Sequence, residues 1–500
     1  MSFAVVQTRA QIGIDAPLVA VETHLSNGLP AFHIVGLAQT AVKESKDRVR
    51  SALLNAHFEF PDTRITVNLA PADIPKHGGR YDLAIALGVL VASGQLPEQS
   101  LDRSEFYAEL GLNGELRHVK GLLPALIQGA RSGNNLFVPA QNATEAGILD
   151  HDETYAAAHL LELCAHLNGN TKLSPVPITN LKSSAQLHGD FSDVKGQYMA
   201  KRAIEIAASG RHNVLFTGPP GTGKTMLASR MPGILPVLSS EQALQVASIH
   251  SLTVSSDFIP FSGSPPFRAP HHSASSTAMV GGGSHPRPGE ISMAHNGVLF
   301  LDEFPEFPRS VVEVLREPME SGEICISRAR EQVSYPCRFQ LLAARNPCPC
   351  GYDGDQRVQC RCTPEQIARY NRKLSGPLLD RIDLHVTVSR VSPREFDNKD
   401  EREESSATVL KRVNTARAIQ LQRQNCLNND LSSPQIRDIC KLANSEQELL
   451  YAASEQLNLS ARAYHKVLKV ARTIADMKAE EGISKAALLE AMGYRATVEQ

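Results

Sequence analysis

The residues with the clearest chemical meaning lie at positions 218–225, where the sequence reads Gly-Pro-Pro-Gly-Thr-Gly-Lys-Thr. This stretch fits the phosphate-binding pattern G-x-x-x-x-G-K-[ST] at every fixed position. The apolar run 213–217 predicts a buried strand before it, and residues 226–230 begin like a helix after it. The glycines let backbone N–H groups close around phosphate oxygens, and the helix N-terminus adds its positive dipole end.

We therefore expect ATP to bind at this loop. Lys224 would reach the β- and γ-phosphates, and the Thr225 hydroxyl would ligate Mg²⁺. The alternative is a chance glycine-rich turn. The expected nucleotide-binding residues of the loop are Gly218, Pro219, Pro220, Gly221, Thr222, Gly223, Lys224 and Thr225.

A pair of carboxylates follows a second apolar run. Residues 297–301 predict a strand, and Asp302 and Glu303 come directly after it. In doubly wound sheets the chemistry lies at the carboxyl ends of the strands, beside the phosphate loop. Asp302 would hold Mg²⁺, directly or through water, and Glu303 would polarise the attacking water. An exposed acidic pair at a strand end is the alternative.

Three further residues are candidates for contact with the nucleotide. Asn346 follows the predicted strand 339–344, where an amide would orient the lytic water or touch the γ-phosphate; a turn asparagine before Pro347 is the alternative. Arg381 would stabilise charge on a neighbouring subunit's γ-phosphate. Arg462 begins a helical pattern and would close a lid over the same nucleotide. For either arginine, an exposed salt-bridging role is the alternative.

Four cysteines form two close pairs, Cys348 with Cys350 and Cys360 with Cys362. Four thiolates suit a tetrahedral structural Zn²⁺, although the C-x-C spacing is tighter than the usual C-x₂₋₄-C. The alternative is four reduced thiols in a loop. A zinc site here would rigidify the segment that leads to Arg381.

Composition describes an ordinary globular protein. The chain has 500 residues, 42% of them hydrophobic and 21% charged, with a formal net charge of −2. Any nucleic-acid surface must therefore be local. No secretory signal is recognisable at the start, and the longest apolar stretch, 84–92, is too short to span a bilayer. Nine cysteines without an export signal predict reduced thiols or metal ligands, and we expect a cytoplasmic protein without membrane partners.

Length predicts about three domains. Residues 1–170 alternate β-rich runs with helical patterns, including a strand at 64–69 and a helix at 82–93. Residues 171–190 read as a linker. A nucleotide-binding core would span 191–391, with a Cys-rich insertion at 346–364, and a helical domain would span 392–500.

These elements together resemble the AAA+ ATPases, specifically their magnesium-chelatase-like branch. Residues 267–274 and 280–297 look like that branch's signature, and residues 193–197 match the stretch that cups adenine. The resemblance implies an α/β fold: an AAA+ P-loop NTPase core with a C-terminal helical lid. It also implies sensor-1, arginine-finger and sensor-2 roles for Asn346, Arg381 and Arg462. One departure is Arg345, where the family pattern predicts an uncharged residue.

The whole chain resembles the ComM/YifB family, whose members are implicated in natural transformation as hexameric motors that drive DNA branch migration. Its N-terminal third resembles the Lon-type protease domain, an α+β ribosomal-S5-like fold. Lon-type proteolysis needs a Ser–Lys dyad. Arg80 stands where the serine would fall and Leu123 where the lysine would fall, so we expect no protease activity.

The resemblance therefore implies an ATP-hydrolysing homohexameric ring that acts as a helicase on single-stranded or branched DNA, with recombination proteins as possible partners. A chelatase-type motor that remodels a partner protein is the alternative. Two basic segments are candidates for gripping DNA. Their residues are Arg268, His271, His272, His285 and Arg287 in the first, and Arg328 and Arg330 at the tip of a predicted hairpin, 323–333.

Overall fold

The computed structural model describes residues 2–179, 189–253, 263–283, 286–327, 332–391, 403–457 and 459–495. The chain divides into two compact units. Unit 1 comprises Met1–Lys182 and Ser240–Ser262, and unit 2 comprises Ser183–Ser239 and Gly263–Gln500. Residues 240–253 thus group with the N-terminal unit, although unit 2 precedes and follows them in sequence. His285, Arg328, Arg330 and linker residues 180–188 lie outside the described residues.

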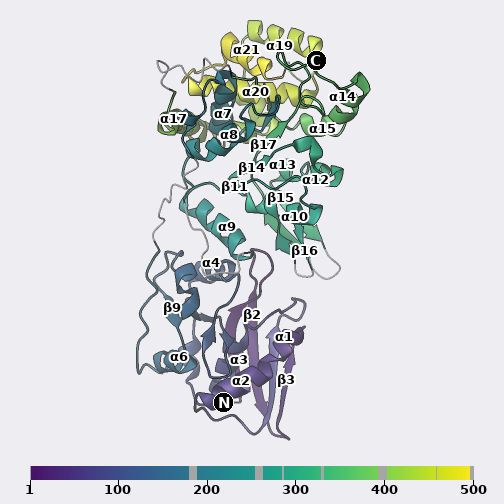
Figure 1. The fold of residues 1–500 in the computed structure, drawn as a ribbon. Helices are drawn as coiled ribbons and strands as arrows, with labels where there is room; N and C mark the ends of the chain where they lie inside the picture. Colours follow the sequence, from purple (N-terminus) through teal and green to yellow (C-terminus); the bar gives the residue numbers. More distant parts are fainter. Residues whose placement is uncertain are drawn as a thin grey trace. The chain divides into compact units, whose positions relative to one another are not determined.

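Unit 1 is built on a seven-stranded mixed sheet with the strand order β3-β4-β2-β1-β5-β8-β9. Strands β2, β3 and β9 of this sheet are labelled in Figure 1. Its strands are β1 (Phe3–Arg9), β2 (Leu18–Ser26), β3 (Ala31–Val35), β4 (Arg64–Ala70), β5 (Ser104–Phe106), β8 (Asn135–Pro139) and β9 (Thr154–Ala157), with a small β6 (Glu109–Leu110) and β7 (Leu116–Arg117) pair. Its helices are α1 (Thr40–Lys43), α2 (Ser45–Asn55), α3 (Asp82–Ala92), α4 (Leu123–Arg131), α5 (Ala143–Ala146), α6 (Leu160–Leu167) and α9 (Ser240–Ser251).

The core of unit 1 forms around α3, which is buried along its whole length. Alternate residues of β1 and β2 are buried, as the two-residue period of a strand requires, and Ala4, Val6, Val19 and Val21 among them belong to the same hydrophobic cluster as α3. Helix α9 packs against α4, so it adds to this unit rather than to the nucleotide-binding core.

Unit 2 contains a five-stranded parallel sheet with the order β11-β14-β17-β10-β18. These strands are β10 (Val214–Thr217), β11 (Phe267–Arg268), β14 (Val298–Leu301), β17 (Gln340–Arg345) and β18 (Leu384–Thr387). Two hairpins accompany it, β12 (Gly281–Gly282) with β13 (Arg287–Pro288) and β15 (Glu323–Ser327) with β16 (Gln332–Pro336). The central strands are continuous apolar runs because both faces of a parallel sheet are covered by helices.

The helices of unit 2 fall into a group around the sheet and a group at the C-terminus. The first group is α7 (Tyr198–Gly210), α8 (Lys224–Arg230), α10 (Ser276–Val280), α11 (Glu290–Met293), α12 (Arg309–Val314), α13 (Pro318–Ser321), α14 (Pro364–Asn371) and α15 (Gly376–Leu379). The second is α17 (Ser406–Gln424), α18 (Ser433–Ile439), α19 (Asn444–Gln456), α20 (Ala461–Met477) and α21 (Lys485–Gly493).

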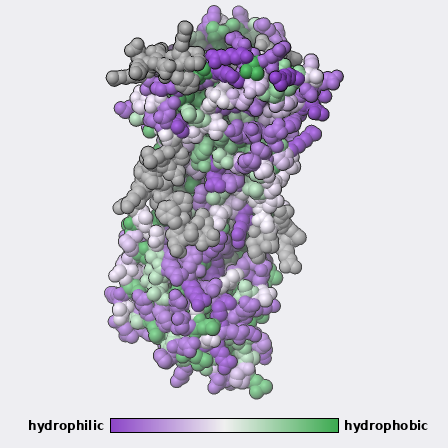
Figure 2. Space-filling view, viewed as in Figure 1, coloured by the Kyte–Doolittle hydropathy of each residue, from purple (hydrophilic) through white to green (hydrophobic). Residues whose placement is uncertain are grey.

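The C-terminal helices share one hydrophobic core with the sheet. Helices α17 and α20 both pack on α7, and Val467 and Ile474 of α20 belong to the same buried cluster as Val214 and Phe216 of β10. Burial of these side chains leaves a largely hydrophilic exterior, with only scattered apolar patches on the face in Figure 2. Among the described helices, none is both long and apolar enough to cross a membrane.

Candidate ATPase site

The parallel strands bring three sequence-predicted groups to one edge of the sheet. Strands β14, β17 and β10 are neighbours, and their carboxyl ends lead directly into Asp302, Asn346 and the loop 218–225. We call this edge the phosphate edge. Gly218 N donates to Arg345 O over 3.2 Å, which ties the first residue of the loop to the end of β17.

Lys224 is buried within this loop. Its Nζ donates to the carbonyl oxygens of Gly218 (2.7 Å) and Pro219 (2.8 Å) and to Asn346 Oδ1 (3.3 Å). Burial lowers the pKa of Lys224, an effect that the negative charges of Asp302 and Glu303 partly offset. All three acceptors are neutral, so the ammonium lacks a directly bonded counter-ion, and an anion such as a phosphate fits beside it.

Two oxygen groups suited to Mg²⁺ lie in contact next to Lys224. Thr225 Oγ1 donates to Asp302 Oδ2 over 2.6 Å, which places a hydroxyl and a carboxylate together. Hard oxygen ligands of this type suit Mg²⁺. Because α8 and β14 each position one of the two groups, the pair depends on the tertiary fold.

Glu303 is held by a residue that sequence reasoning did not assign to it. His272 Nδ1 lies 3.0 Å from Glu303 Oε2, and the Glu303 backbone N–H donates to Asp302 Oδ1 over 2.9 Å. Glu303 also has a φ of +51°, a left-handed conformation that a non-glycine residue seldom adopts. Such outliers concentrate at functional sites, so the geometry fits a carboxylate held in place for chemistry.

Arg381 and Arg462 lie elsewhere in unit 2. Arg381 precedes β18, and its backbone carbonyl accepts a hydrogen bond from Asn213 Nδ2 (3.4 Å) at the start of β10. Both strands run from this edge toward the phosphate edge, so Arg381 sits at the opposite end of the sheet from Lys224. We call this the arginine edge.

Glu320 joins the two arginines at the arginine edge. Arg381 Nη2 lies 2.9 Å and Arg462 Nη2 lies 2.7 Å from the same Glu320 Oε1. That Arg462 closes a lid over the same nucleotide as Arg381 stays a prediction. Its helix, α20, packs on α7 and joins Arg381 at the arginine edge rather than the phosphate loop.

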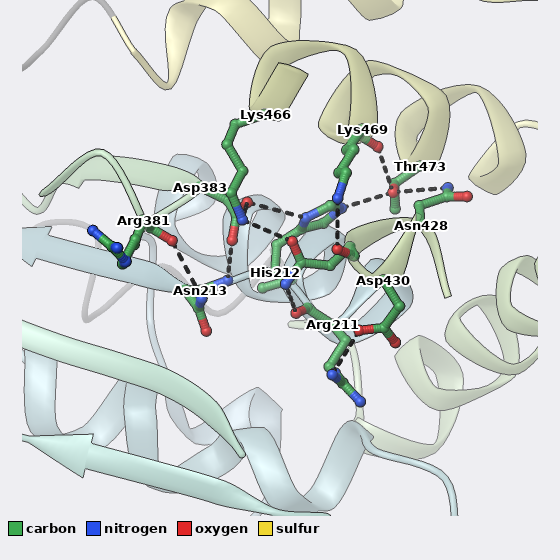
Figure 3. Close-up of polar contacts among 12 residues, drawn as sticks. Arg211, His212, Asn213, Arg381, Asp383, Asn428, Asp430, Lys466, Lys469 and Thr473 are labelled. Carbon is green, nitrogen blue, oxygen red and sulfur yellow. Dashed lines mark hydrogen bonds and ion pairs between the residues drawn. The ribbon is translucent and has the colours of Figure 1, made fainter. Parts of the chain in front are cut away.

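A buried polar network fixes α20 to the arginine edge (Figure 3). Lys466 Nζ lies 2.7 Å from Asp383 Oδ1, and the Asn213 backbone N–H donates to Asp383 Oδ2 over 2.7 Å. His212 Nε2 lies 2.8 Å from Thr473 Oγ1 of α20. The network therefore connects the C-terminal helix to the starts of β10 and β18.

Electrostatics favour a charged Asp383 and a neutral His212 in this network. Burial by itself raises the pKa of Asp383, but the Lys466 charge and the His212 hydrogen bond outweigh it and hold that pKa well below its usual range. Burial lowers the pKa of His212 despite the attraction of Asp383. Burial, together with repulsion from Lys466, lowers the pKa of Lys469 to about 8.

A cavity of about 680 Å³ opens at the arginine edge. It lies between the start of the sheet, α13 and the C-terminal helices, and more of its charged residues are basic than acidic. Its charged lining residues are Arg211, Arg338, Arg462, Lys466 and Lys469 with Glu320 and Asp430. Such a lining suits an anionic ligand.

The four cysteines of the predicted zinc site converge. Cys348 Sγ lies 3.3 Å from Cys350 Sγ and 3.7 Å from Cys360 Sγ, and Cys350 and Cys360 are 3.5 Å apart. All four sulfur atoms, including that of Cys362, lie within 4.8 Å of one another. Zn–S bonds of about 2.3 Å in a tetrahedron place sulfur atoms about 3.8 Å apart, so the cluster fits Zn²⁺.

Neighbouring residues support the phosphate loop. Gln197, in the stretch expected to cup adenine, donates to Thr222 O (3.2 Å) and to Ser389 O (2.6 Å). Arg345, the departure from the family pattern, donates through Nε to Thr217 Oγ1 over 3.0 Å. Arg345 thus links the ends of two neighbouring strands beside Asn346.

The first basic segment contains paired residues as well as exposed ones. Arg268 forms a bidentate ion pair with Glu290, with both contacts at 2.7 Å. His271 lies 2.9 Å from Ser273 Oγ, whereas Arg287 is exposed. The ion pair gives Arg268 a structural role, which is the alternative to a role in gripping DNA.

In unit 1, the two positions compared with a Lon-type dyad are buried. Arg80 Nη2 donates to Gln11 Oε1 (2.7 Å) and to Lys120 O (2.8 Å). Leu123 begins α4 and lies in a hydrophobic cluster. Both side chains therefore have packing roles here.

Comparison with protein-family models gives three matches. Residues 190–396 match the model described as "Magnesium chelatase, subunit ChlI", residues 21–142 match "Subunit ChlI of Mg-chelatase", and residues 403–495 match the C-terminal ChlI model. Competence protein ComM of Haemophilus influenzae is 51% identical over 100% of this chain and 98% of its own length. YifB of Escherichia coli is 50% identical over 99% of this chain and 97% of its own length.

The chain belongs to the ComM/YifB family. A magnesium-chelatase 38 kDa subunit from Cereibacter sphaeroides is 26% identical over 42% of this chain and 60% of its own length. The sequence-based predictions of this family and of an α/β AAA+ P-loop core with C-terminal helices are confirmed. The magnesium-chelatase-like branch consists of AAA+ ATPases, so the protein is a member of an ATPase family.

Sequence reasoning missed two partners in this ComM/YifB-family site. Neither His272, which contacts Glu303, nor Glu320, which joins the two arginines, had been assigned that role. The His271–His272 pair was a visible signal, but the identity of its acidic partner depends on the pairing of β11 with β14. Glu320 belongs to no motif, so no sequence signal marked it.

Proposed function

We propose that this protein hydrolyses ATP as a homohexameric ring motor in the cytoplasm that acts on single-stranded or branched DNA. The activity would promote branch migration during natural transformation or recombination. The observation that carries the ATPase part is the meeting of Lys224, Asn346 and the Thr225–Asp302 pair at one sheet edge. The DNA part is supported by the similarity to ComM of Haemophilus influenzae, which is a competence protein.

Each residue has a defined task in this proposal. Lys224 binds the β- and γ-phosphates, and Thr225 with Asp302 would hold Mg²⁺, which would supply charge neutralisation for phosphoryl transfer. Glu303 orients the attacking water and accepts its proton, while His272 keeps the Glu303 carboxylate in place. Asn346 orients the water or the γ-phosphate.

Arg381 and Arg462 act on the nucleotide of a neighbouring subunit in this proposal. They lie at the opposite end of the sheet from the phosphate loop of their own chain, beside a cavity with a basic lining. When a neighbour's triphosphate enters that cavity, the two arginines exchange Glu320 for phosphate oxygens. Stabilisation of this kind is worth about 10³ or more in rate.

A structural Zn²⁺ held by the four clustered cysteines is part of the proposal. Metal analysis of the purified protein should find about one zinc per chain. A folded, active, zinc-free preparation would remove the zinc from the proposal.

A second function is a chelatase-type motor that remodels a partner protein. The match of residues 190–396 to the magnesium-chelatase model favours it. The test is the ATPase rate with no addition, with single-stranded DNA, with forked DNA and with a candidate partner protein. Stimulation by DNA supports the motor on DNA, whereas stimulation by protein alone supports the second function.

A further inference from the structure

The turn that follows Cys350 lies against the phosphate loop. Gly351, the residue after Cys350, lies so close to the loop that a Cβ added there would be 2.7 Å from Pro220 Cδ and 3.8 Å from Asn346 Cγ. Gly351 has a φ of +85°, and its N–H donates to Cys348 O over 3.0 Å. The turn that carries the first two thiols is thus pressed against both the loop and Asn346.

The cluster is also connected to the loop through the chain. Asn346 accepts a hydrogen bond from Lys224, and Cys348 is only two residues further on. Cys348 is fully buried. Because only Pro347 separates Cys348 from Asn346, the backbone position of Cys348 constrains that of Asn346, the acceptor that Lys224 contacts.

A second anchor holds the other half of this segment. Arg390 Nε lies 3.0 Å from Asp355 Oδ2, and the Arg390 guanidinium lies 5.5 Å from the centre of the Tyr352 ring. Between residues 346 and 362 the structure assigns no helix and no strand. Without a backbone ladder, the shape of this segment depends on its anchors and on bonds that the four sulfurs make to a common metal ion.

We propose that zinc bound by Cys348, Cys350, Cys360 and Cys362 holds Gly351 against Pro220 and thereby keeps the phosphate loop in its ATP-binding shape. Zinc occupancy then controls the affinity for ATP within the same chain. This inference rests on the zinc and nucleotide sites proposed above. It differs from the sequence-based hypothesis, in which zinc acts on the segment leading to Arg381.

Two glycines in the same segment provide the first test. Gly351→Ala keeps all four cysteines but inserts a methyl group against Pro220. Gly354→Ala is the matched control, because Gly354 has a similar φ of +73° and a Cβ there would meet nothing within 4 Å. Zinc content is measured by mass spectrometry and ATP affinity by titration with a fluorescent ATP analogue.

The expected results separate contact from backbone strain. Both variants should retain zinc at the wild-type level. Gly351→Ala should bind the analogue about tenfold or more weakly, since displacements near 1 Å at such sites have effects of that order. Gly354→Ala should bind it like the wild type. Equal affinities for the wild type and Gly351→Ala would overturn the inference.

Removal of the metal provides the second test. The double variant Cys360→Ser with Cys362→Ser should lose zinc and bind the ATP analogue about tenfold or more weakly. Cys325→Ser, which changes an exposed cysteine outside the cluster, should alter neither quantity. A zinc-free double variant with wild-type ATP affinity would refute the coupling.

The outcomes also separate this inference from the proposals beneath it. Wild-type protein without zinc would remove the zinc site, and the coupling with it. Wild-type ATP affinity in a Lys224→Ala variant would remove the nucleotide site. If the wild type contains zinc and Lys224→Ala weakens ATP binding, but Gly351→Ala has no effect, only the coupling between the two sites is refuted.

Discussion

Arg381 offers the sharpest test of the arrangement, because it lies at the wrong end of the sheet to serve its own phosphate loop. Strand β18 has four residues, which span about 13 Å at the rise of a parallel strand. The phosphate loop begins where the neighbouring parallel strand β10 ends, at the far end of the sheet from Arg381. An arginine side chain cannot bridge that distance. An Arg381→Ala variant should therefore bind ATP normally and lose about 10³-fold or more in hydrolysis rate.

Mixing two inactive variants turns this geometry into a measurement. Lys224→Ala lacks the phosphate-binding lysine, and Arg381→Ala lacks the group offered to a neighbour. In an equimolar mixed ring with head-to-tail contacts, about a quarter of the interfaces join an intact loop to an intact arginine. The steady-state ATPase rate of the mixture should reach about a quarter of the wild-type rate, since each such interface forms one complete site.

The control is a mixture of Lys224→Ala with Glu303→Gln, whose defects both lie at the phosphate edge of one subunit. Every subunit in that mixture has an altered phosphate edge. No interface can therefore join an intact phosphate edge to Arg381, whichever subunits are neighbours. The control mixture should remain inactive. If the Lys224→Ala and Arg381→Ala mixture stays equally inactive, the two-subunit site is refuted.

Three further predictions follow from single contacts. His272→Ala should lower kcat about tenfold and leave ATP affinity unchanged, as judged by steady-state kinetics and ATP titration, because Glu303 loses its 3.0 Å partner; unchanged kcat would contradict this role. Asp383→Ala should lower the free energy of unfolding by about 3–5 kcal/mol in urea titrations, because Lys466 is left without its buried partner; a loss below 1 kcal/mol would contradict it. Burial, with repulsion from nearby arginines, lowers the pKa of His295 to about 4, so the folded state disfavours protonation of this residue. The free energy of unfolding should therefore decrease as the pH is lowered from 6.5 to 4, by up to about 1.4 kcal/mol per pH unit. His295→Gln should reduce that slope in urea titrations.

Local patterns were sufficient to predict much of the fold and the phosphate edge. The loop 218–225 and the Asp302–Glu303 pair each combine an apolar strand with polar residues that follow it at once, so a short window contains the whole signal. The strands predicted at 64–69 and 297–301 and the helix predicted at 82–93 correspond to β4, β14 and α3 for the same reason.

The remaining features depend on contacts between distant residues. Glu320 meets Arg462 across 142 positions of sequence, and Asp383 meets Lys466 only because α20 packs at the start of β18. Residues 240–251 have an ordinary helical pattern, and that pattern does not reveal that α9 packs against α4 of unit 1 rather than against the nucleotide-binding core that surrounds it in sequence. Periodicity predicts which face of an element is buried but not which element covers it.

The opposite placement of the phosphate loop and the two arginines has a consequence for regulation by concentration. A single subunit has only part of an active site at each edge, so dissociated subunits in dilute solution should bind ATP without hydrolysing it. Turnover should then climb more steeply than protein concentration until assembly is complete. The concentration of the protein, rather than the concentration of ATP, would determine when hydrolysis begins.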